Sequence, residues 1–542
     1  MYKRQLIPLV VLCAALCGCG KVIPADDEVA VVPLPERVAK GQGTFLLTAS
    51  TEAVLLSGDD SLACVTGALD QVLEPVFGKG LRVRHADVPL DGALNISCDA
   101  AMPADGYRLE ITPGRAEIVA GSAAGAFYAV QTLRQLIPAA AYGAANVRAV
   151  ELPVVTIEDK PCLGYRGMML DVCRHFFPVE DVKTYIDILS LHKINKFHWH
   201  LTDDQGWRIE IKKYPLLTQI GSRRAETLVG RYDKNKEGVY DGKPYGGFYT
   251  QEEIREIVSY AAERHIEVIP EIEMPGHGLA ALTAYPWLGC TGGPYAVWTH
   301  WGISDDVYCA GKETTFEFIE DVLTEVLALF PSKLIHIGGD ECPKGRWKAC
   351  PLCQQRIREE GLKDEYQLQS YFIHRIERWM HTHGREIIGW DEILQGGISK
   401  TANIMSWNGS DPGIKAAQRG NPVIMTPKWY CYFDYSQTSD PERYEPLGNT
   451  RYVSVRQAYR LDPCDRLTLP DQKRIRGVQC NLWTEYIADI RHAQHMVLPR
   501  MAALAETGWA NDRKDYNDFV RRIPALVAVY KAEGYNLSLI HI

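Results

Sequence analysis

The chain has 542 residues, of which 46% are hydrophobic, and it carries a formal net charge of −9. A chain of this length and composition buries a large core and is expected to fold into more than one domain. The acidic balance and the lack of any long run of lysine or arginine argue against nucleic acid as a partner.

The two ends of the chain resemble a cloning or sequencing adapter. Codons can be chosen so that the DNA for Met1–Gln5 is the reverse complement of the first bases of the DNA for Leu537–Ile542. Such a pair of ends is typical of transposon-derived adapters. Residues 1–5 and 537–542 are therefore expected to be adapter scars, and they are left out of the fold prediction.

Residues 6–19 are typical of an export signal. The apolar run from Leu6 to Leu16 is too short for a stable membrane anchor and suits a signal peptide. The following residues resemble a bacterial lipobox, which makes Cys19 the candidate for lipidation, with an ordinary secretory signal or a random apolar start as the alternatives. We expect an exported protein, held by a lipid anchor in the periplasm or outer membrane of a Gram-negative bacterium.

Residues 30–155 are predicted to form a small α+β domain. The strand-like segments 107–111 and 116–120 flank a Pro-Gly pair and predict a hairpin, and residues 124–137 have the pattern of a helix. No catalytic cluster is evident in this domain.

From residue 160 to residue 531, strand-like and helix-like segments alternate, which predicts a (β/α)₈ TIM barrel. The link 390–402 is too short for a crossover helix and the link 428–476 is long and irregular, so the fifth and seventh helices are expected to be missing or remodelled. The eight predicted strands are 167–170, 196–201, 266–272, 334–337, 386–389, 402–406, 422–426 and 477–482.

The segment from His336 to Glu341 is the central motif, because an apolar run ends there at two glycines followed by Asp340 and Glu341. The carboxyl ends of barrel strands form the active-site mouth, and the glycines allow both carboxylates to face one pocket. A solvated turn is the alternative interpretation of such a pair. Polar or aromatic residues also follow the other predicted strands, and these are Asp171, Arg174, Asp203, Asp204, Glu273, His277, Trp390, Glu392, Trp407, Tyr432, Asp434, Trp483 and Glu485.

A ring of tryptophans with carboxylates and one arginine suits a sugar. Indole faces pack on the apolar faces of a pyranose, and charged groups take its hydroxyls in strong hydrogen bonds. The sequence contains neither a Walker loop nor a dinucleotide glycine fingerprint, and no cofactor is expected.

Five motifs together make the chain resemble the family 20 glycoside hydrolases, the β-N-acetylhexosaminidases, over residues 30–530. The resemblance implies an exo-acting enzyme that removes terminal non-reducing β-linked GlcNAc or GalNAc by substrate-assisted, retaining catalysis through an oxazolinium intermediate. Chitin fragments, N-glycans, mucin and milk oligosaccharides all stay open as the natural glycan. The motifs are residues 164–178, 198–208, 275–277, 336–341 and 482–485.

The resemblance also implies catalytic roles. Glu341 would be the general acid and then the general base, and Asp340 would accept the acetamido N–H and stabilise the developing positive charge. Tyr432 would donate to the acetamido oxygen. Asp203 and His277 would form a relay that supports Glu341.

Six further residues are expected by the same resemblance to bind the sugar. The tryptophans would enclose the acetamido methyl group, and the charged residues would hold hydroxyl groups. Family members often carry another aromatic platform before the last strand, for which only Tyr452 is a counterpart here, so subsites beyond the terminal sugar stay open. The six residues are Arg174, Trp390, Trp407, Asp434, Trp483 and Glu485.

Three other functions compete with this interpretation. His198-x-His200 is typical of metal-dependent hydrolases, which would recruit His277 and Asp340, but both histidines precede the end of their predicted strand, so no metal is expected here. The other two are a glycan-binding lipoprotein without activity and an enzyme of the lacto-N-biosidase type that releases a disaccharide.

Export permits disulfides, and Cys290 and Cys309 are predicted to form one that holds an active-site loop. Cys342, Cys350 and Cys353 include one CxxC motif but lack a fourth ligand in tetrahedral spacing. A second disulfide or free thiols are therefore favoured over structural zinc.

Overall fold

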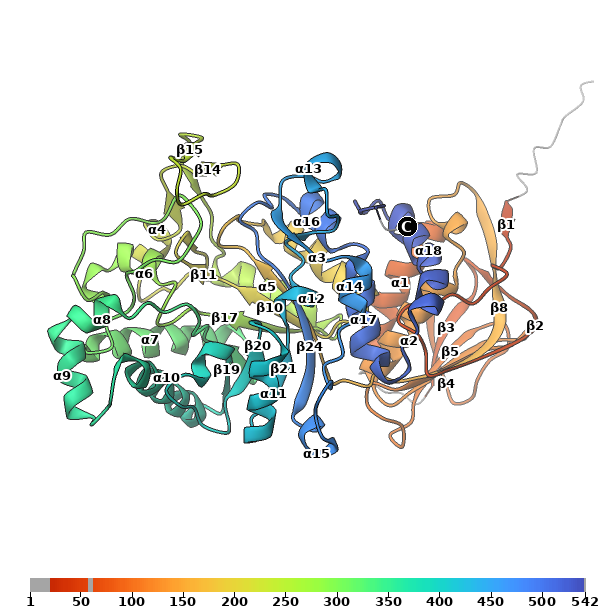
Figure 1. The fold of residues 1–542 in the computed structure, drawn as a ribbon. Coiled ribbons are helices and arrows are strands. Elements are labelled where there is room, and N and C mark those ends of the chain that lie inside the picture. Colours follow the sequence, from red (N-terminus) through yellow and green to blue (C-terminus); the bar gives the residue numbers. More distant parts are fainter. Residues whose placement is uncertain (1–19, 57–61, 541–542) are drawn as a thin grey trace, which may run out of the picture.

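The computed structural model describes residues 20–56 and 62–540, which form two parts lying side by side (Figure 1). The predicted scar 1–5, the predicted signal 6–19 with Cys19, and residues 541–542 lie outside the described residues. The described residues of the other predicted scar, 537–540, lie against the second part, where the Ser538 N–H donates to the Leu498 carbonyl (3.1 Å). None of the described helices combines the length and hydrophobicity that a bilayer-spanning segment requires.

The N-terminal part is an eight-stranded sheet with the order β1-β8-β6-β7-β5-β3-β4 and β2 paired to β8. The predicted hairpin is formed, since β6 and β7 are antiparallel with Tyr107 opposite Ala120. The helices are α1 (Ala63–Phe77) and α2 (Ala123–Leu136). The strands are β1 (Lys21–Ile23), β2 (Arg37–Thr48), β3 (Glu52–Leu56), β4 (Arg82–Ala86), β5 (Leu94–Cys98), β6 (Tyr107–Ile111), β7 (Ala116–Ala120) and β8 (Val147–Asp159).

The second part contains a closed barrel of eight parallel strands, so the predicted fold class is confirmed. Each observed strand overlaps a predicted one, because strands buried on both faces are read from the sequence as apolar runs. The strands are β9 (Tyr165–Asp171), β10 (Lys196–His200), β17 (Glu267–Glu271), β18 (Leu334–His336), β19 (Glu386–Trp390), β20 (Asn403–Ser406), β21 (Val423–Met425) and β24 (Ile475–Leu482).

The helices that cover the barrel are irregular at the two predicted places. The fifth crossover is reduced to the single 3₁₀ turn η4 (Asp391–Leu394), and between β21 and β24 only helices of four or five residues occur in the described chain. The covering helices are α3 (Val179–Leu191), α5 (Gln251–Ala262), α7 (Glu313–Leu329), α10 (Glu365–Thr382), α11 (Ser410–Arg419), α16 (Ile490–Val497), α17 (Arg500–Ala510) and α18 (Tyr516–Ala532).

Shorter helices and strands lie in the loops at the carboxyl ends of the barrel strands and in the link between β21 and β24. The helical ones are α4 (Leu216–Gln219), α6 (Leu279–Ala284), η3 (Pro286–Leu288), α8 (Gly345–Ala349), α9 (Pro351–Glu359), α12 (Lys428–Cys431), α13 (Pro441–Tyr444), α14 (Val455–Tyr459) and α15 (Leu469–Gln472). The strands include β11 (Thr202–Asp203), β12 (Gly206–Trp207), β22 (Tyr435–Ser436) and β23 (Asn449–Tyr452).

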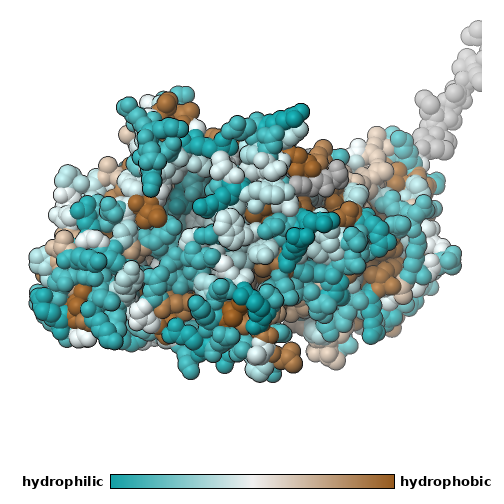
Figure 2. Space-filling model, viewed as in Figure 1, coloured by the Kyte–Doolittle hydropathy of each residue, from teal (hydrophilic) through white to brown (hydrophobic). Residues whose placement is uncertain are grey.

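The two parts are joined by buried polar contacts and by one shared tryptophan. Asp159, at the end of β8, accepts from Lys193 Nζ (3.1 Å) and from Trp509 Nε1 (2.8 Å), and neither member of the Asp159–Lys193 pair is exposed. Trp509 lies on α17 of the barrel yet packs in the hydrophobic core of the N-terminal part. The two parts therefore share core residues. Figure 2 shows a mainly hydrophilic face on which hydrophobic residues form small, scattered groups.

Candidate active site

The turn after β18 brings Asp340 and Glu341 to one cavity. Gly338 and Gly339 have φ of +67° and +95°, and Glu341 itself has φ of +42°, a left-handed conformation that is rare for a residue with a side chain. A Cβ on Gly338 would lie 1.7 Å from Glu273 Oε2, so any other residue there would displace the Glu273 side chain. The glycine pair therefore turns the chain so that both carboxylates line the same cavity.

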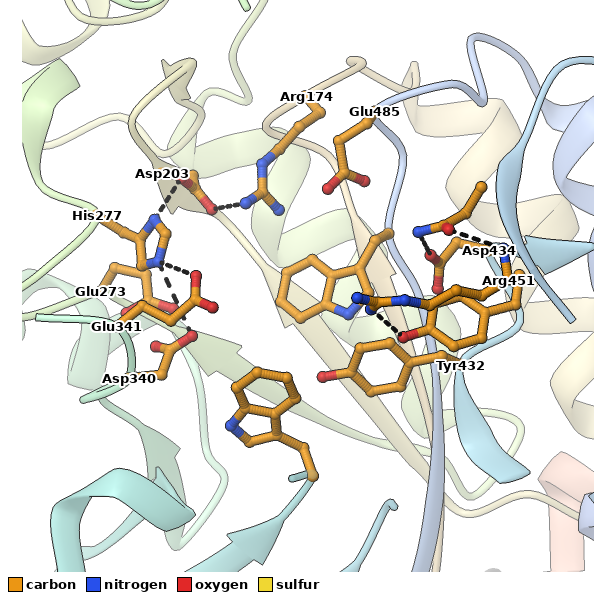
Figure 3. Close-up of a pocket in the computed structure, with 14 residues that line it drawn as sticks. Arg174, Asp203, Glu273, His277, Asp340, Glu341, Tyr432, Asp434, Arg451 and Glu485 are labelled. Carbon is orange, nitrogen blue, oxygen red and sulfur yellow. Dashed lines mark hydrogen bonds and ion pairs between the residues drawn. The ribbon is translucent and has the colours of Figure 1, made fainter. Parts of the chain in front are cut away.

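This cavity has a volume of about 180 Å³ and lies at the carboxyl ends of the barrel strands, where the sequence predicts the site. Asp340, Glu341 and His277 lie on one side and Tyr432 and Asp434 on the other (Figure 3). Ten of the eleven predicted catalytic and sugar-binding residues line it. They are Arg174, Asp203, His277, Asp340, Glu341, Trp407, Tyr432, Asp434, Trp483 and Glu485.

Trp390 is the predicted site residue that does not line the cavity. As the last residue of β19 it points into the barrel interior, where it is 1% exposed and its Nε1–H donates to Glu271 (2.8 Å). Its ring lies 5.9 Å from that of Trp483. Trp390 therefore packs behind the wall of the cavity, and its predicted contact with the sugar is not what this geometry indicates.

Four lining residues received no role from the sequence, namely Glu273, Tyr435, Asn449 and Arg451. Glu273 follows the end of β17, so it is one of the polar residues that come directly after a predicted strand, as the other site residues do. Asn449 and Arg451 come from β23, in the long irregular link, where no periodicity marks them. Arg451 donates to the Tyr435 hydroxyl (2.8 Å), whereas the neighbouring Tyr452, considered as a sugar platform, does not line the cavity.

The predicted relay residues lie in a row. His277 Nε2 is 3.5 Å from Glu341 Oε2, and its Nδ1 is 3.2 Å from Asp203 Oδ1 and 3.3 Å from Asp204 Oδ2. Burial opposes charge on both partners, but Arg174 and His277 outweigh it at Asp203 and hold the pKa of that carboxyl well below its usual value. The facing carboxylates likewise outweigh burial at His277 and raise its pKa well above its usual value. The pair is therefore an imidazolium and a carboxylate.

Arg174 is fixed before any ligand binds. Its guanidinium contacts Asp171 (3.1 Å), Asp203 (2.8 Å) and the side chain of Gln205 (2.9 Å), and it stacks 5.0 Å from the centre of the Trp483 ring. A guanidinium held by two carboxylates in a buried site keeps its charge and its orientation. It can therefore direct a remaining N–H at a ligand hydroxyl without losing side-chain entropy.

Asp340 and Asp434 present acceptors to the cavity. Asp340 Oδ1 and Asp434 Oδ1 are buried and have no hydrogen-bond partner within the described part of the chain. Burial raises the pKa of Asp340 well above its usual value, and repulsion from Glu392 and Glu341 adds to this effect, while His277 opposes it. Burial likewise raises the pKa of Asp434. Both carboxyls therefore favour a ligand that donates hydrogen bonds.

A second polar cluster lies below the cavity, inside the barrel. Glu271 contacts His198 (3.0 Å), His336 (2.7 Å) and His200, and His200 Nε2 also contacts Asp203 (2.9 Å). His198 and His200 are turned toward this carboxylate and do not line the cavity. The His-x-His motif thus supports Asp203 from below and does not converge with Asp340.

Comparisons with known proteins agree with this geometry. The model of the catalytic domain of glycosyl hydrolase family 20 matches residues 163–512, and the model of domain 2 of that family matches residues 28–160. The chain is 45% identical over 520 residues to a β-hexosaminidase of Porphyromonas gingivalis, covering 95% of this chain and 65% of that protein. The chain thus spans about two thirds of that relative's length.

Two solved structures are similar over almost the whole chain. An N-acetyl-β-hexosaminidase of Streptomyces plicatus, in complex with thio-NAglucal, superimposes with a TM-score of 0.82 at 32% identity, covering 95% of this chain and 97% of that one. An exo β-N-acetylglucosaminidase of Vibrio harveyi, in complex with N-acetylglucosamine, gives a TM-score of 0.83 at 31% identity and covers 94% and 78%.

Proposed function

This chain belongs to glycosyl hydrolase family 20, and on that premise we propose that it is an exo-acting β-N-acetylhexosaminidase that releases terminal non-reducing β-linked GlcNAc or GalNAc. The observation that carries the proposal is the placement of Asp340 and Glu341 in one small cavity walled by Trp407, Trp483 and Tyr432. Pockets for drug-sized ligands usually enclose about 300–1,000 Å³. A cavity of about 180 Å³ therefore suits a single terminal sugar.

The nucleophile in this mechanism belongs to the substrate. The carbonyl oxygen of the 2-acetamido group bonds to the anomeric carbon as the glycosidic C–O bond breaks, and Glu341 gives its proton to the leaving oxygen. In the second half, water attacks the anomeric carbon, the bond between that carbon and the acetamido oxygen breaks, and Glu341 takes a proton from the water. Because the attacking group is already held beside the anomeric carbon, no bimolecular encounter is needed.

His277 supports this exchange of protons. Its imidazolium Nε2 lies 3.5 Å from Glu341 Oε2, so it can stabilise the carboxylate that Glu341 becomes after giving up its proton. Asp203 keeps His277 charged and oriented from the other side. Both residues therefore position Glu341.

Asp340 and Tyr432 act on the acetamido group. Asp340 Oδ1 would accept the acetamido N–H, which orients the carbonyl oxygen and places a negative charge beside the forming oxazolinium. The hydroxyl of Tyr432 would donate to the acetamido oxygen. Its ring is stacked with that of Trp407 (6.0 Å between centres) and tilted against that of Trp483 (6.2 Å). Arg174, Asp434 and Glu485 would then hold the ring hydroxyls.

Release of 4-nitrophenol from the β-GlcNAc and β-GalNAc glycosides tests the proposal, in the wild type and Glu341→Gln, each with and without EDTA. We expect turnover that resists EDTA and falls about 10²-fold or more in the variant, because general acid–base groups usually contribute 10²–10⁴-fold. Immediate loss of turnover in EDTA, with the circular dichroism spectrum and the thermal midpoint unchanged, would instead point to a metal hydrolase. Failure on both glycosides would favour release of a disaccharide or binding without turnover.

We further propose that the protein is exported and lipid-anchored through Cys19, where it acts on glycans such as chitooligosaccharides, N-glycans, mucin or milk oligosaccharides. The apolar run Leu6 to Leu16 and the lipobox-like residues that follow it support this proposal. Expression in a Gram-negative host tests it, since Cys19→Ser should abolish palmitate labelling and move the protein from the membrane fraction to the soluble fraction. Equal labelling of both proteins would contradict the anchor.

A further inference from the structure

Four cysteines that are far apart in the sequence meet beside the barrel. The sulfur atoms of Cys290, Cys309, Cys350 and Cys353 all lie within 4.8 Å of one another. Three of the contacts are Cys290–Cys353 (3.8 Å), Cys309–Cys350 (3.8 Å) and Cys309–Cys353 (3.6 Å). Cys309, Cys350 and Cys353 are buried, and Cys290 is partly buried. The predicted bridge between Cys290 and Cys309 is not formed in the structure, which has both as free thiols.

The fold presents these sulfurs from two directions. An isolated antiparallel bridge between Gly289 and Tyr308 sets Cys290 beside Cys309 in the loop after β17. Cys350 is the N-cap of α9, and Cys353 lies in the first turn of that helix. Cys342, which the sequence analysis grouped with Cys350 and Cys353, does not belong to this cluster. Cys290 and Cys309 supply the ligands that the sequence could not identify.

The separations match a tetrahedral metal–thiolate centre. Zinc binds thiolate sulfur at about 2.3 Å, and a tetrahedron of that radius has edges of about 3.8 Å. The three contacts of 3.6–3.8 Å agree with such edges. A disulfide would bring two sulfurs to about 2.05 Å. Four soft ligands with no carboxylate or imidazole among them favour zinc over harder cations such as magnesium or calcium.

The surroundings can stabilise thiolates. The backbone N–H of Gly311 donates to the Cys309 sulfur, and the N-terminus of α9 adds unpaired N–H groups beside Cys353. A Cβ on Gly311 would lie 2.3 Å from the Leu352 carbonyl carbon, so this glycine permits the helix to approach. Lys312 Nζ donates to the Gly289 carbonyl (2.7 Å), which places a positive charge beside a centre that would carry a net charge of −2.

We propose that Cys290, Cys309, Cys350 and Cys353 bind one zinc ion, with the loss of four thiol protons, and that this ion is a structural staple. None of the four lines the catalytic cavity, so the ion has no role in the chemistry of the reaction. The site fastens α9, which begins ten residues after Glu341, to the loop after β17 that follows His277. Zinc thereby holds together the loop that carries His277 and the loop that carries the acidic pair.

Metal content and thiol state of the purified wild type test this inference directly. Elemental analysis should find one zinc per chain, and X-ray absorption at the zinc edge should find four sulfur neighbours at about 2.3 Å. Alkylation after denaturation in chelator should label all four cysteines. Two disulfides, seen as unlabelled cysteines and a mass lower by about 2 Da per bridge, would overturn the proposal, and so would four free thiols without metal.

Matched variants locate the site. Cys350→Ser/Cys353→Ser should lose the zinc and melt at a lower temperature, whereas Cys464→Ser, a cysteine elsewhere in the fold, should keep both properties. If the double variant fails to fold, the absorption spectrum of the wild type decides the ligand set without it. Zinc retained by a folded double variant would contradict the assignment. None of these measurements uses activity, so the outcome is independent of the proposed hydrolase function.

Discussion

Two adjacent carboxylates in this protein have different surroundings. The side chain of Asp340 is 11% exposed, whereas that of Glu341 is 34% exposed and reaches the opening of the cavity. Burial favours the neutral form of Asp340, and Glu341 lies 3.5 Å from the imidazole of His277. A difference in environment thus separates the residue proposed to orient the substrate from the residue proposed to exchange protons with it.

Asp340→Asn tests this division. The amide cannot supply the negative charge beside the forming oxazolinium, so we expect kcat to fall about 10²–10³-fold, with a smaller change in KM. Because burial raises the pKa of Asp340, and the carboxylate is the form that accepts the N–H, wild-type kcat/KM should decline on the acidic side at a pH above the usual aspartate value of about 3.9. A decline at the usual value would contradict it.

Glu392 gives a prediction about stability. Burial, with repulsion from Asp391, raises its pKa to about 7, against 4.5 in an unfolded chain. As the pH rises, the unfolded chain therefore gives up this proton at a lower pH than the folded protein does. Between pH 4.5 and 7 the ionisation of Glu392 costs the wild type roughly 3 kcal/mol of stability, and above pH 7 the cost stays constant.

Glu392→Gln should remove that part of the pH dependence, because glutamine does not titrate. Urea unfolding at pH 5 and pH 8 should show a smaller loss of stability in the variant than in the wild type. Equal losses in the two proteins would show that Glu392 ionises normally in the folded state.

The turn after β18 shows how an element sets the site. Its two glycines are visible in the sequence, and the inference that they let Asp340 and Glu341 share a pocket agrees with their observed φ angles and with the cavity. By contrast, Asn449 and Arg451 reach the same cavity from β23, a short strand that pairs with β22. Irregular links are positioned by tertiary contacts, so local pattern does not reveal which of their side chains point inward.

Gly338→Ala tests the turn. The added Cβ would overlap Glu273 Oε2, and the residue has the left-handed φ that alanine disfavours. We expect a loss of about 1–3 kcal/mol of stability, with a reduced kcat, because the carboxylates after the turn are displaced. Gly345→Ala is the matched control, since a Cβ there meets no atom of the described residues within 4 Å. Similar thermal midpoints and kcat values for the two variants would contradict this account.

The extent of sequence-based prediction also differs between parts of the fold. Barrel strands buried on both faces are found as apolar runs, and the residues after them follow from the topology. Trp390 is the exception, because the last residue of a strand can point into the barrel as easily as toward its mouth. The cysteine cluster could not be predicted from the sequence. Cys290 and Cys309 lie in one loop, Cys350 and Cys353 lie in another, and the two loops come together only in the folded chain.

At the scale of the whole molecule, Asp159 and Lys193 join the two parts through a fully buried ion pair. Lys193→Met would leave the buried Asp159 carboxylate with only the more distant, partly exposed Arg513 (3.7 Å) as a cation among the described residues. We expect a loss of about 3–5 kcal/mol in urea unfolding, and partial recovery in Asp159→Asn/Lys193→Met. Arg37→Met, which removes one partner of the exposed pair Arg37–Glu158, should change stability by less than about 1 kcal/mol. Equal effects of Lys193→Met and Arg37→Met would contradict the coupling.

A cavity that admits one sugar also governs how a polymer is shortened over time. Under the proposed function, a newly formed chain end would not enter while the released sugar occupies the cavity, so the polymer would leave between successive cuts. We then expect distributive degradation, in which chains of every intermediate length accumulate together before any chain is fully consumed. The rate would follow the number of free chain ends in the mixture and not the length of each chain.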